Sequence, residues 1–352
     1  EDCFFDESGR YRKEFANSSV VFLNVALHDH ALCGAAAADC GDGHADELWL
    51  PLTYDAATHT LYCGATAIPS SIESRPGAEN DDYHRVYKLP TGNYYLADNI
   101  ELTGGEATKG TTTTGGALKI AEGTDVKLCL NGKTLSTAMK LGDVVDMDVG
   151  AALTLSDCKG GGTILSTANA YNGVQIHDAV TKDAGRFIMY GGTITGAQYG
   201  VVVYDADSFA MYGGTITGNG VGVRVSSSII VGGTVNITGN TKNVYLLGTG
   251  SENGVITIDP GLTQDARIGV TTEKAPGTDS SVKIAEGASG SLNYTGIFTP
   301  DVKGRNYVVA RNDADELLLA VHVHDWQYAL KDGTTDTITA VCNSGGCPNT
   351  DG

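Results

Sequence analysis

The stretch Tyr190-Gly191-Gly192-Thr193-Ile194-Thr195-Gly196 recurs unchanged as Tyr212-Gly213-Gly214-Thr215-Ile216-Thr217-Gly218. Its Gly-Gly-Thr centre also occurs earlier and later in the chain, so that copies start at residues 161, 191, 213 and 232, with spacings of 30, 22 and 19 residues. A short period of this kind is typical of a solenoid, in which each repeat packs only against its neighbours.

Two further motifs alternate with this one. The first is found at 172–176, 199–203 and 219–223, and the second at 186–190 and 208–212. Pieces of five residues cannot form an independent sheet. If the coils stack on one another, each piece can pair in register with the equivalent piece of the next coil, about 4.8 Å away. Alternate side chains then point into a narrow core.

The repeat therefore predicts an all-β fold, a right-handed parallel β-helix with three short strands per coil. Glycine supplies the positive φ that its tight corners need. The alternative is a set of hairpin turns in an antiparallel sandwich, whose strands are longer and do not share a sequence.

Composition narrows the class of protein. With 41% hydrophobic and 18% charged residues, the chain is expected to fold. The net charge of −19 disfavours nucleic acids and anionic membrane surfaces as partners, and also polyuronates unless Ca²⁺ or a local basic cluster intervenes. No apolar run reaches the roughly 18 residues of a membrane span. The opening Glu1-Asp2-Cys3 lacks an initiator Met and a signal peptide, as expected for a mature or trimmed chain.

Three regions are expected. Residues 1–88 form a β-rich N-terminal cap or small domain with a His/Cys cluster, residues 89–312 form the β-helix, and residues 313–352 begin a C-terminal His/Cys-containing module. A cap would cover the strand edges that an open coil exposes. Three aromatic residues of the first region are expected in its core, with a role as binding contacts as the alternative: Trp49, Tyr54 and Tyr62.

The order of Leu89–Leu96, Leu128–Thr134, Leu153–Cys158 and the Met-Tyr-Gly-Gly-Thr-Ile-Thr-Gly repeats resembles a family of cell-surface proteins. These belong to anaerobic gut Gram-positive bacteria and carry pectate-lyase-like right-handed parallel β-helix repeats. The resemblance covers residues 89–240 and implies a secreted or surface location. It implies no particular activity, because this fold serves lyases, glycosidases, adhesins and passive stalks alike.

Histidine and cysteine residues gather near both ends of the chain. A His-x-His pair followed by two cysteines can supply four ligands to a structural Zn²⁺, and alternate residues of a strand share one face. The possible ligands are His28, His30, Cys33, Cys40, His322, His324, Cys342 and Cys347. Disulfides such as Cys33–Cys40 or Cys342–Cys347 are one alternative, and free thiols are the other. Cys129 and Cys158 are expected in the core. Leu153 and Leu155 alternate within a predicted coil at 151–163, so they are expected to point inward.

Alignment of the strands at 172–176, 199–203 and 219–223 places His177, Tyr204 and Arg224 in one exposed row, with Gln175 on the same strand as His177. This row is the expected binding surface.

Asp178 and Asp205 would lie beside the row on adjacent coils, about 5 Å apart. With His177 as a base they are the weak candidates for catalysis, and the two carboxylates could instead hold Ca²⁺. We favour the simpler interpretation that both aspartates serve turn chemistry. A further acidic set is interpreted as a solvated edge: Asp143, Asp146 and Asp148.

The favoured function is an extracellular module that acts as an adhesin or binding segment for host or microbial glycans or surface proteins, within a larger surface protein. The first alternative is a polysaccharide lyase or glycoside hydrolase that works on the β-helix face. The second is a structural stalk that presents other domains.

Overall fold

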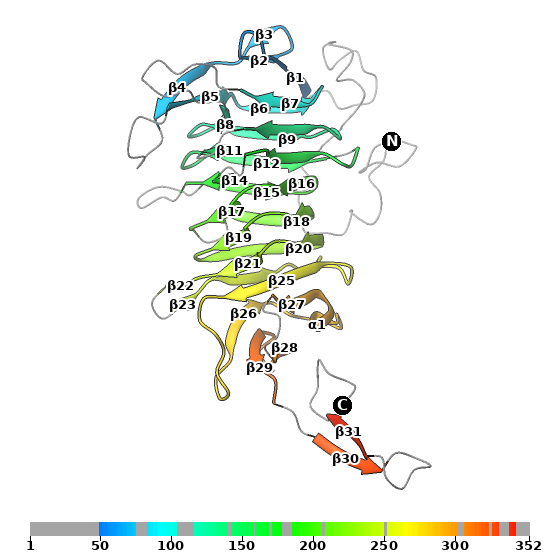
Figure 1. Cartoon of the computed structure of the whole chain (residues 1–352). Helices are drawn as coiled ribbons and strands as arrows, with labels where there is room; N and C mark the ends of the chain where they lie inside the picture. The colour runs from blue at the N-terminus through cyan, green and yellow to red at the C-terminus, as the bar shows by residue number, and fades with distance from the viewer. Residues whose placement is uncertain are drawn as a thin grey trace.

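The structure is a computed structural model. It describes residues 49–74, 83–103, 116–138, 142–157, 159–168, 171–177, 185–205, 208–249, 252–301, 306–323, 326–330 and 338–342. The regular secondary structure of these residues is almost entirely β-strand, and most strands belong to one long, mostly parallel sheet. Figure 1 shows the strands stacked in layers along one axis.

Most strands pair with the strand three places further along the chain, which divides the sheet into three parallel ladders. The first ladder consists of β5 (Tyr83–Leu89), β8 (Gly116–Ile120), β11 (Asp143–Met147), β14 (Asn172–Ile176), β17 (Tyr199–Val203), β19 (Val221–Val225), β21 (Lys242–Leu246) and the end of β25 (Arg267–Thr272).

The second ladder consists of β6 (Gly92–Leu96), β9 (Asp125–Cys129), β12 (Ala152–Ser156), β15 (Arg186–Met189), the first halves of β18 (Phe209–Ile216) and β20 (Ser228–Ile237), β24 (Val255–Ile258) and β26 (Val282–Glu286). The third consists of β7 (Ile100–Leu102), β10 (Thr134–Thr137), β13 (Thr163–Ser166), β16 (Thr193–Thr195), the second halves of β18 and β20, the start of β25, and β27 (Phe298–Pro300).

One circuit of the chain thus passes through all three ladders. The predicted motifs at 172–176 and 199–203 coincide with β14 and β17, whereas the one at 219–223 lies two residues before β19. The Gly-Gly-Thr-Ile copies supply the third ladder, where Ile164, Ile194 and Ile216 stack in register and are buried. This arrangement is compatible with a parallel β-helix.

Antiparallel elements lie at both ends of the stack (Figure 1). At the N-terminal end these are β1 (Trp49–Asp55), β2 (Thr60–Cys63) and β3 (Thr66–Ala67), with β4 (Ser70–Ser74) paired to β5. At the C-terminal end β28 (Tyr307–Arg311) and β29 (Leu317–Val321) form a hairpin that pairs with β26. Parallel pairing already includes β5 and the β1–β6 pair, so it extends upstream of residue 89.

Three smaller elements complete the described chain. A short helix, α1 (Tyr294–Ile297), precedes β27, and the two-residue strands β22 (Gly248–Thr249) and β23 (Glu252–Asn253) form a hairpin between the first and second ladders. The hairpin of β30 (Trp326–Leu330) and β31 (Ile338–Cys342) lies apart from the stack in Figure 1.

The core is a narrow column of aliphatic side chains between the ladders. In the first ladder Val145, Val174, Val201, Val223 and Val244 lie in register, and all are fully buried. Such continuous burial supplies the main stabilisation of the stack, at about 25 cal/mol for each Å² of apolar surface removed from water. As predicted, Cys129, Leu153 and Leu155 are buried in this core.

The repeated glycines stand where neighbouring coils approach closely. Gly214 has a φ of +90°, and a Cβ placed there would lie 2.7 Å from the carbonyl oxygen of Gly192 and 2.7 Å from the methyl carbon of Met189. A side chain at this corner is therefore excluded both by the backbone conformation and by the space available.

Candidate binding face

The outer side of the first ladder presents a row of side chains that alternate with the buried valines. We call it the central row. Its members, paired in register from one coil to the next, are Lys88, Lys119, Asp146, Gln175, Val202, Arg224, Tyr245 and Thr271. The row two residues further along each strand holds Asp148, His177 and Tyr204. The two rows bring together charged and aromatic side chains from seven separate strands or strand ends.

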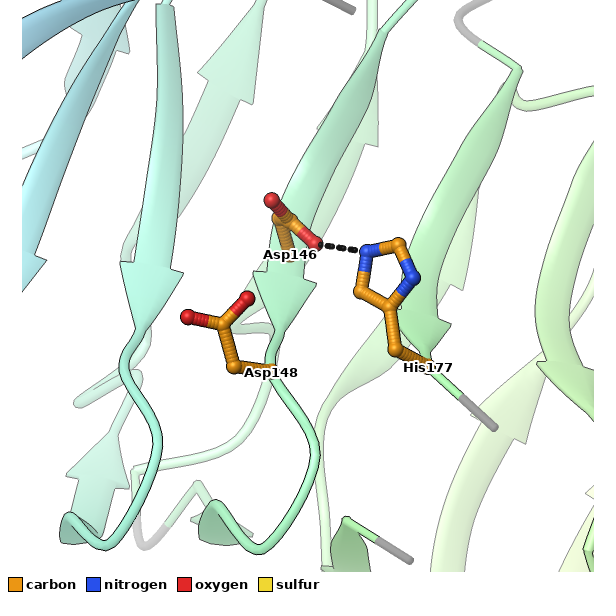
Figure 2. A group of neighbouring side chains, drawn as sticks. All are labelled: Asp146, Asp148 and His177. Atoms are coloured by element: carbon orange, nitrogen blue, oxygen red, sulfur yellow. Dashed lines mark hydrogen bonds and ion pairs between the residues drawn. The ribbon is translucent and has the colours of Figure 1, made fainter. Parts of the chain in front are cut away.

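Three side chains around Lys119 form the most connected part of this face. Its Nζ lies 2.9 Å from Oδ2 of Asp146 and 2.8 Å from Oδ1 of Asp148. On the next strand His177 Nε2 lies 2.8 Å from Oδ1 of Asp146, the contact drawn in Figure 2. Asp146 is therefore held from two sides, and only 13% of its side chain is exposed. The prediction that it belongs to a solvated edge is wrong, because a lysine from the preceding coil covers it.

The network continues toward the N-terminal end of the stack through Glu73 on β4. Its carboxylate lies 3.8 Å from the Lys119 ammonium and 2.7 Å from that of Lys88, the preceding member of the central row. Lys119 consequently faces three carboxylates. Charges of both signs alternate here, so this half of the face is largely neutralised within the protein.

The pKa values follow from these contacts. The hydrogen bond with Asp146 raises the pKa of His177, and it outweighs the partial burial of the imidazole, which acts in the opposite direction. Burial disfavours the charged carboxylate of Asp146, but the bond to His177 and the charge of Lys119 prevail and lower its pKa. Burial likewise opposes the charge of Lys119, yet Asp146 and Asp148 raise its pKa. The contact thus favours the charged form of both partners, the imidazolium of His177 and the carboxylate of Asp146.

The geometry around Asp146 also resembles a cation site. One ligand atom from each of Asp146, Asp148 and His177 lies within 4.8 Å of the others. However, the Lys119 ammonium already touches both carboxylates at hydrogen-bonding distance. A divalent ion could take these ligands only if that ammonium moved away, because two cations would otherwise share one small space. The residues fit an internal lysine better than a metal.

The C-terminal half of the face has a different character. Arg224 on β19 places its guanidinium 5.5 Å from the ring centre of Tyr204, and Lys242 places its ammonium 3.8 Å from the ring centre of Tyr245. Both contacts join a cation to an aromatic ring at the distances of cation–π attraction. We call these four residues the cation–tyrosine patch. With 38% of its surface exposed, Tyr204 is one of the most exposed aromatic residues on the stack.

The register of one predicted row is corrected by the structure. Tyr204 stands opposite His177, as expected, but Arg224 pairs with Val202 and so belongs to the row of Gln175. The sequence alignment matches Gly200 with Gly220, whereas in the structure Gly200 lies opposite Gly222 on the next coil. Cβ atoms at Gly200 and Gly222 would meet the next coil's carbonyl oxygen at 2.5 and 2.6 Å, so both positions require glycine. Arg224 nevertheless contacts Tyr204 through its long side chain.

Gln175 is placed differently from the other predicted binding residues. Its side chain is buried, accepts a hydrogen bond from Asn172 Nδ2 at 2.8 Å, and donates one to the carbonyl oxygen of Ile176 at 3.0 Å. Its polar atoms are therefore used within the strand. Asp205 is half-buried just after Tyr204, and its carbonyl oxygen accepts a bond from the Ser208 hydroxyl.

Several predicted residues cannot be placed on this face. Those outside the described residues are His28, His30, Cys33, Cys40, Cys158, Asp178, His324 and Cys347. His322 follows β29 and is 5% exposed, and Cys342 ends β31, where the structure describes the backbone alone. The zinc, disulfide and calcium hypotheses that rest on these residues stay predictions.

Sequence reasoning did not select Lys119, Lys242 or Tyr245. A signal was present for Lys119 and Tyr245, since each stands at an outward position of a short alternating strand. Lys242 stands two residues before the buried Val244, so alternation alone would have turned it inward. Their strands, however, lack the Gly-Val motif that marked the aligned coils, so no row could be traced through them without the register.

Comparison of the chain with protein-family models, with curated proteins and with solved structures found no match. In the part of the chain that the structure describes, no helix is long and apolar enough to cross a membrane.

Proposed function

We propose that this chain is an extracellular binding module, a right-handed parallel β-helix with an N-terminal cap, which attaches to glycans or surface proteins through the outer face of its first ladder. The three parallel ladders support the β-helix, and the antiparallel strands β1 to β3 at its N-terminal end support the cap. The resemblance of the repeats to those of surface proteins from gut Gram-positive anaerobes supports the location.

One observation carries the binding role. Two tyrosines and two cations from three successive coils meet in the cation–tyrosine patch. Tyrosine and arginine are enriched where proteins bind, because a rigid aromatic ring and a planar cation contribute large contact area at small entropic cost.

The test compares binding of the whole chain with that of a Tyr204→Ala variant on an array of glycans and host and microbial surface proteins. Tyr171→Ala is the matched control, because this tyrosine is 37% exposed but lies at the other edge of the ladder, about 20 Å along the strand from the Tyr204 row. We expect Tyr204→Ala to lose most of the binding and Tyr171→Ala to keep it. Binding that both variants retain would place the site elsewhere, and absence of any ligand would favour a structural stalk.

The hydrogen-bonded His177–Asp146 pair favours a second candidate, a polysaccharide lyase or glycoside hydrolase. A histidine oriented by a carboxylate can transfer protons to a substrate. Incubation with a panel of glycans, followed by assay of reducing ends and unsaturated products, tests this activity. If the chain cleaves a glycan and His177→Ala abolishes this activity, the protein is an enzyme and the binding role is replaced. If no polymer yields product, the binding module stays the proposal.

A further inference from the structure

The last strand of the first ladder has an open edge. On β25, Thr272 pairs with Leu246 of the preceding coil. On the other side, β27 is in register with β25 only as far as Val270, whose carbonyl oxygen accepts the N–H of Asp301 at 3.0 Å. Because the backbone groups of alternate residues point to the same side of a strand, the N–H and C=O of Thr272 face the position of a further strand. No backbone group of the described residues pairs with them there.

A cavity of about 190 Å³ lies beside this open edge, and its walls are mainly apolar. The walls include Val270 and Thr272 of β25, Ala275, Pro300, and Tyr307 and Leu319 of the hairpin formed by β28 and β29. A closed cavity of roughly 150 Å³ holds benzene, so this one has room for a single apolar side chain. The unpaired backbone beside it can at the same time bond to an extended main chain. The open edge and the cavity together suit a β-strand that carries an apolar side chain.

The hairpin of β30 and β31 has the complementary features. Tyr328 and Leu330 are alternate residues of β30 and therefore share one face, and Ile338 of β31 lies opposite Leu330 in register. The three side chains are 69%, 61% and 66% exposed. Among the described strands, β30 and β31 pair only with each other. The hairpin therefore offers an uncovered apolar face and unpaired backbone edges.

The hairpin of the same chain is poorly placed to use its own cavity. It begins at Trp326, five residues after the end of β29 at Val321, and β29 itself forms part of the cavity wall. Figure 1 shows the hairpin extending away from the stack, beyond β28 and β29. In this position its apolar face is directed to what lies beyond the end of the stack.

We propose that two copies of this chain associate through their C-terminal ends. Each copy places its β30–β31 hairpin on the open edge of the other copy's β25, and one apolar side chain of the hairpin enters the cavity. The same two surfaces then meet twice, as in a closed two-fold pair. The contact uses the end of the stack, so it is independent of the binding role proposed for the outer face of the first ladder.

The area available fits a weak dimer. Each of the three exposed side chains can bury about 100 Å². With two hairpins and a similar area on the receiving surfaces, the interface amounts to on the order of 1,200 Å², the lower end for specific complexes. The net charge of −19 on each copy opposes association. The dimer should therefore become tighter as NaCl screens this repulsion.

Sedimentation equilibrium of the full chain over a range of concentrations tests the proposal. We expect the average mass to rise from that of one copy toward that of two, and to do so at lower protein concentration when NaCl is added. Hydrogen exchange of the β30 and β31 amides should be fast in dilute solution and slow down over the same concentrations, because the dimer covers the hairpin.

Variants address the two surfaces separately. Leu330→Ser and Tyr328→Ser each remove an exposed apolar side chain from the hairpin. Ala275→Trp fills the cavity from an exposed part of its wall, and Thr272→Pro removes the unpaired N–H at a strand edge, where proline is tolerated. Each should weaken association at least about tenfold, because every contact occurs twice in the pair. Tyr171→Ser, which removes a 37% exposed tyrosine from the central coils, is the control and should leave association unchanged.

Three results would overturn the inference, given circular dichroism spectra that show each variant folded. The first is a chain that stays monomeric at every concentration and at high NaCl. The second is a dimer that both hairpin variants and both cavity-side variants leave unaffected, since other surfaces would then hold it. The third is protection of the hairpin that does not change with concentration, because the contact would then form within one chain.

Discussion

His177 illustrates how a single residue gains its properties from a neighbouring coil. Nothing in its own strand favours the charged form, yet Asp146 on β11 accepts its Nε2 proton at 2.8 Å. The protonated imidazole is thereby stabilised in the folded protein and its pKa rises above the usual 6.5. The carboxylate of Asp146 is stabilised in turn, and its pKa falls below 3.8. The pKa values of both residues therefore depend on a contact that forms only when the two coils stack.

The pH dependence of this pair has a definite sign. The raised pKa of His177 stabilises the folded protein fully below about pH 6.5, and this stabilisation is lost as the pH rises through the pKa of the folded state. The lowered pKa of Asp146 stabilises the folded protein above about pH 3.8, and this stabilisation is lost as the pH falls through the lowered pKa. In Asp146→Asn we expect the pKa of His177 to fall toward 6.5, measured by NMR titration of its ring protons. Asp125→Asn, an exposed aspartate of the second ladder, should leave it unchanged. An unaltered titration in Asp146→Asn would contradict the assigned contact.

At the scale of elements, the corner between the third and first ladders is tied by a chain of buried amides. Asn219 donates to Asn240 at 3.0 Å, Asn240 donates to Asn243 at 3.0 Å, and Asn243 donates to Asp301 at 2.5 Å. Asn219 also accepts the backbone N–H of Ala197 at 3.0 Å. The amides link successive coils where the chain turns and the regular strand pairing is interrupted, so they satisfy polar groups that would otherwise be buried alone.

Removal of one of these amides should lower the free energy of unfolding by an amount that depends on how many polar groups lose their hydrogen-bond partners. Asn219→Ala leaves the Ala197 N–H without its acceptor and removes the hydrogen bonds that the Asn219 amide donates to Asn240 and to the carbonyl oxygen of Ile194. We expect it to lower the free energy of unfolding by about 1–3 kcal/mol. Urea denaturation followed by circular dichroism measures this loss. Asn236→Ala is the control, because its side chain accepts only a local bond from Thr238 and should cost clearly less. Equal losses would argue that the amide chain has no special role.

At the scale of the whole molecule, stability is expected to be uneven. The central coils are held on both sides by parallel neighbours and by a buried aliphatic column. The hairpin of β30 and β31 has only its own pairing, and Tyr328, Leu330 and Ile338 on it are more than 60% exposed. A two-stranded ribbon of this kind is marginal in water.

Hydrogen exchange followed by mass spectrometry tests this gradient. Backbone amides of β30 and β31 should exchange faster than those of β14 and β17 by on the order of 100-fold or more, because opening the hairpin disrupts far fewer buried contacts. β28 and β29, which pair with β26, are the internal comparison and should be intermediate. Protection of the hairpin equal to that of the central coils would mean that another segment covers its apolar side chains.

Much of the architecture was predictable because it is repetitive. The strands at 172–176 and 199–203 share a glycine at their second position and the same alternation of side chains. Stacking them in register buries their apolar side chains, so the local sequence pattern and the tertiary pairing favour the same structure. The inward positions of Leu153 and Leu155 followed from alternation for the same reason. The row that holds His177 and Tyr204 was predictable only in part, because successive coils differ in length. Tyr204 lies 27 residues after His177 but only 22 residues before Ser226, its partner on the next coil.

By itself, the sequence determined that the fold is all-β, where several of its strands lie and which face of them is buried, because hydrophobic alternation and obligatory glycines act over a few residues. Only the tertiary structure decided that Lys119 meets Asp146 and His177, and that Arg224 rests on Tyr204. Those contacts join residues of different coils, and a shift of two residues in one turn changes every partner across the ladder without altering which side chains are buried. Burial therefore specifies the fold, while register specifies which side chains meet on its outer face.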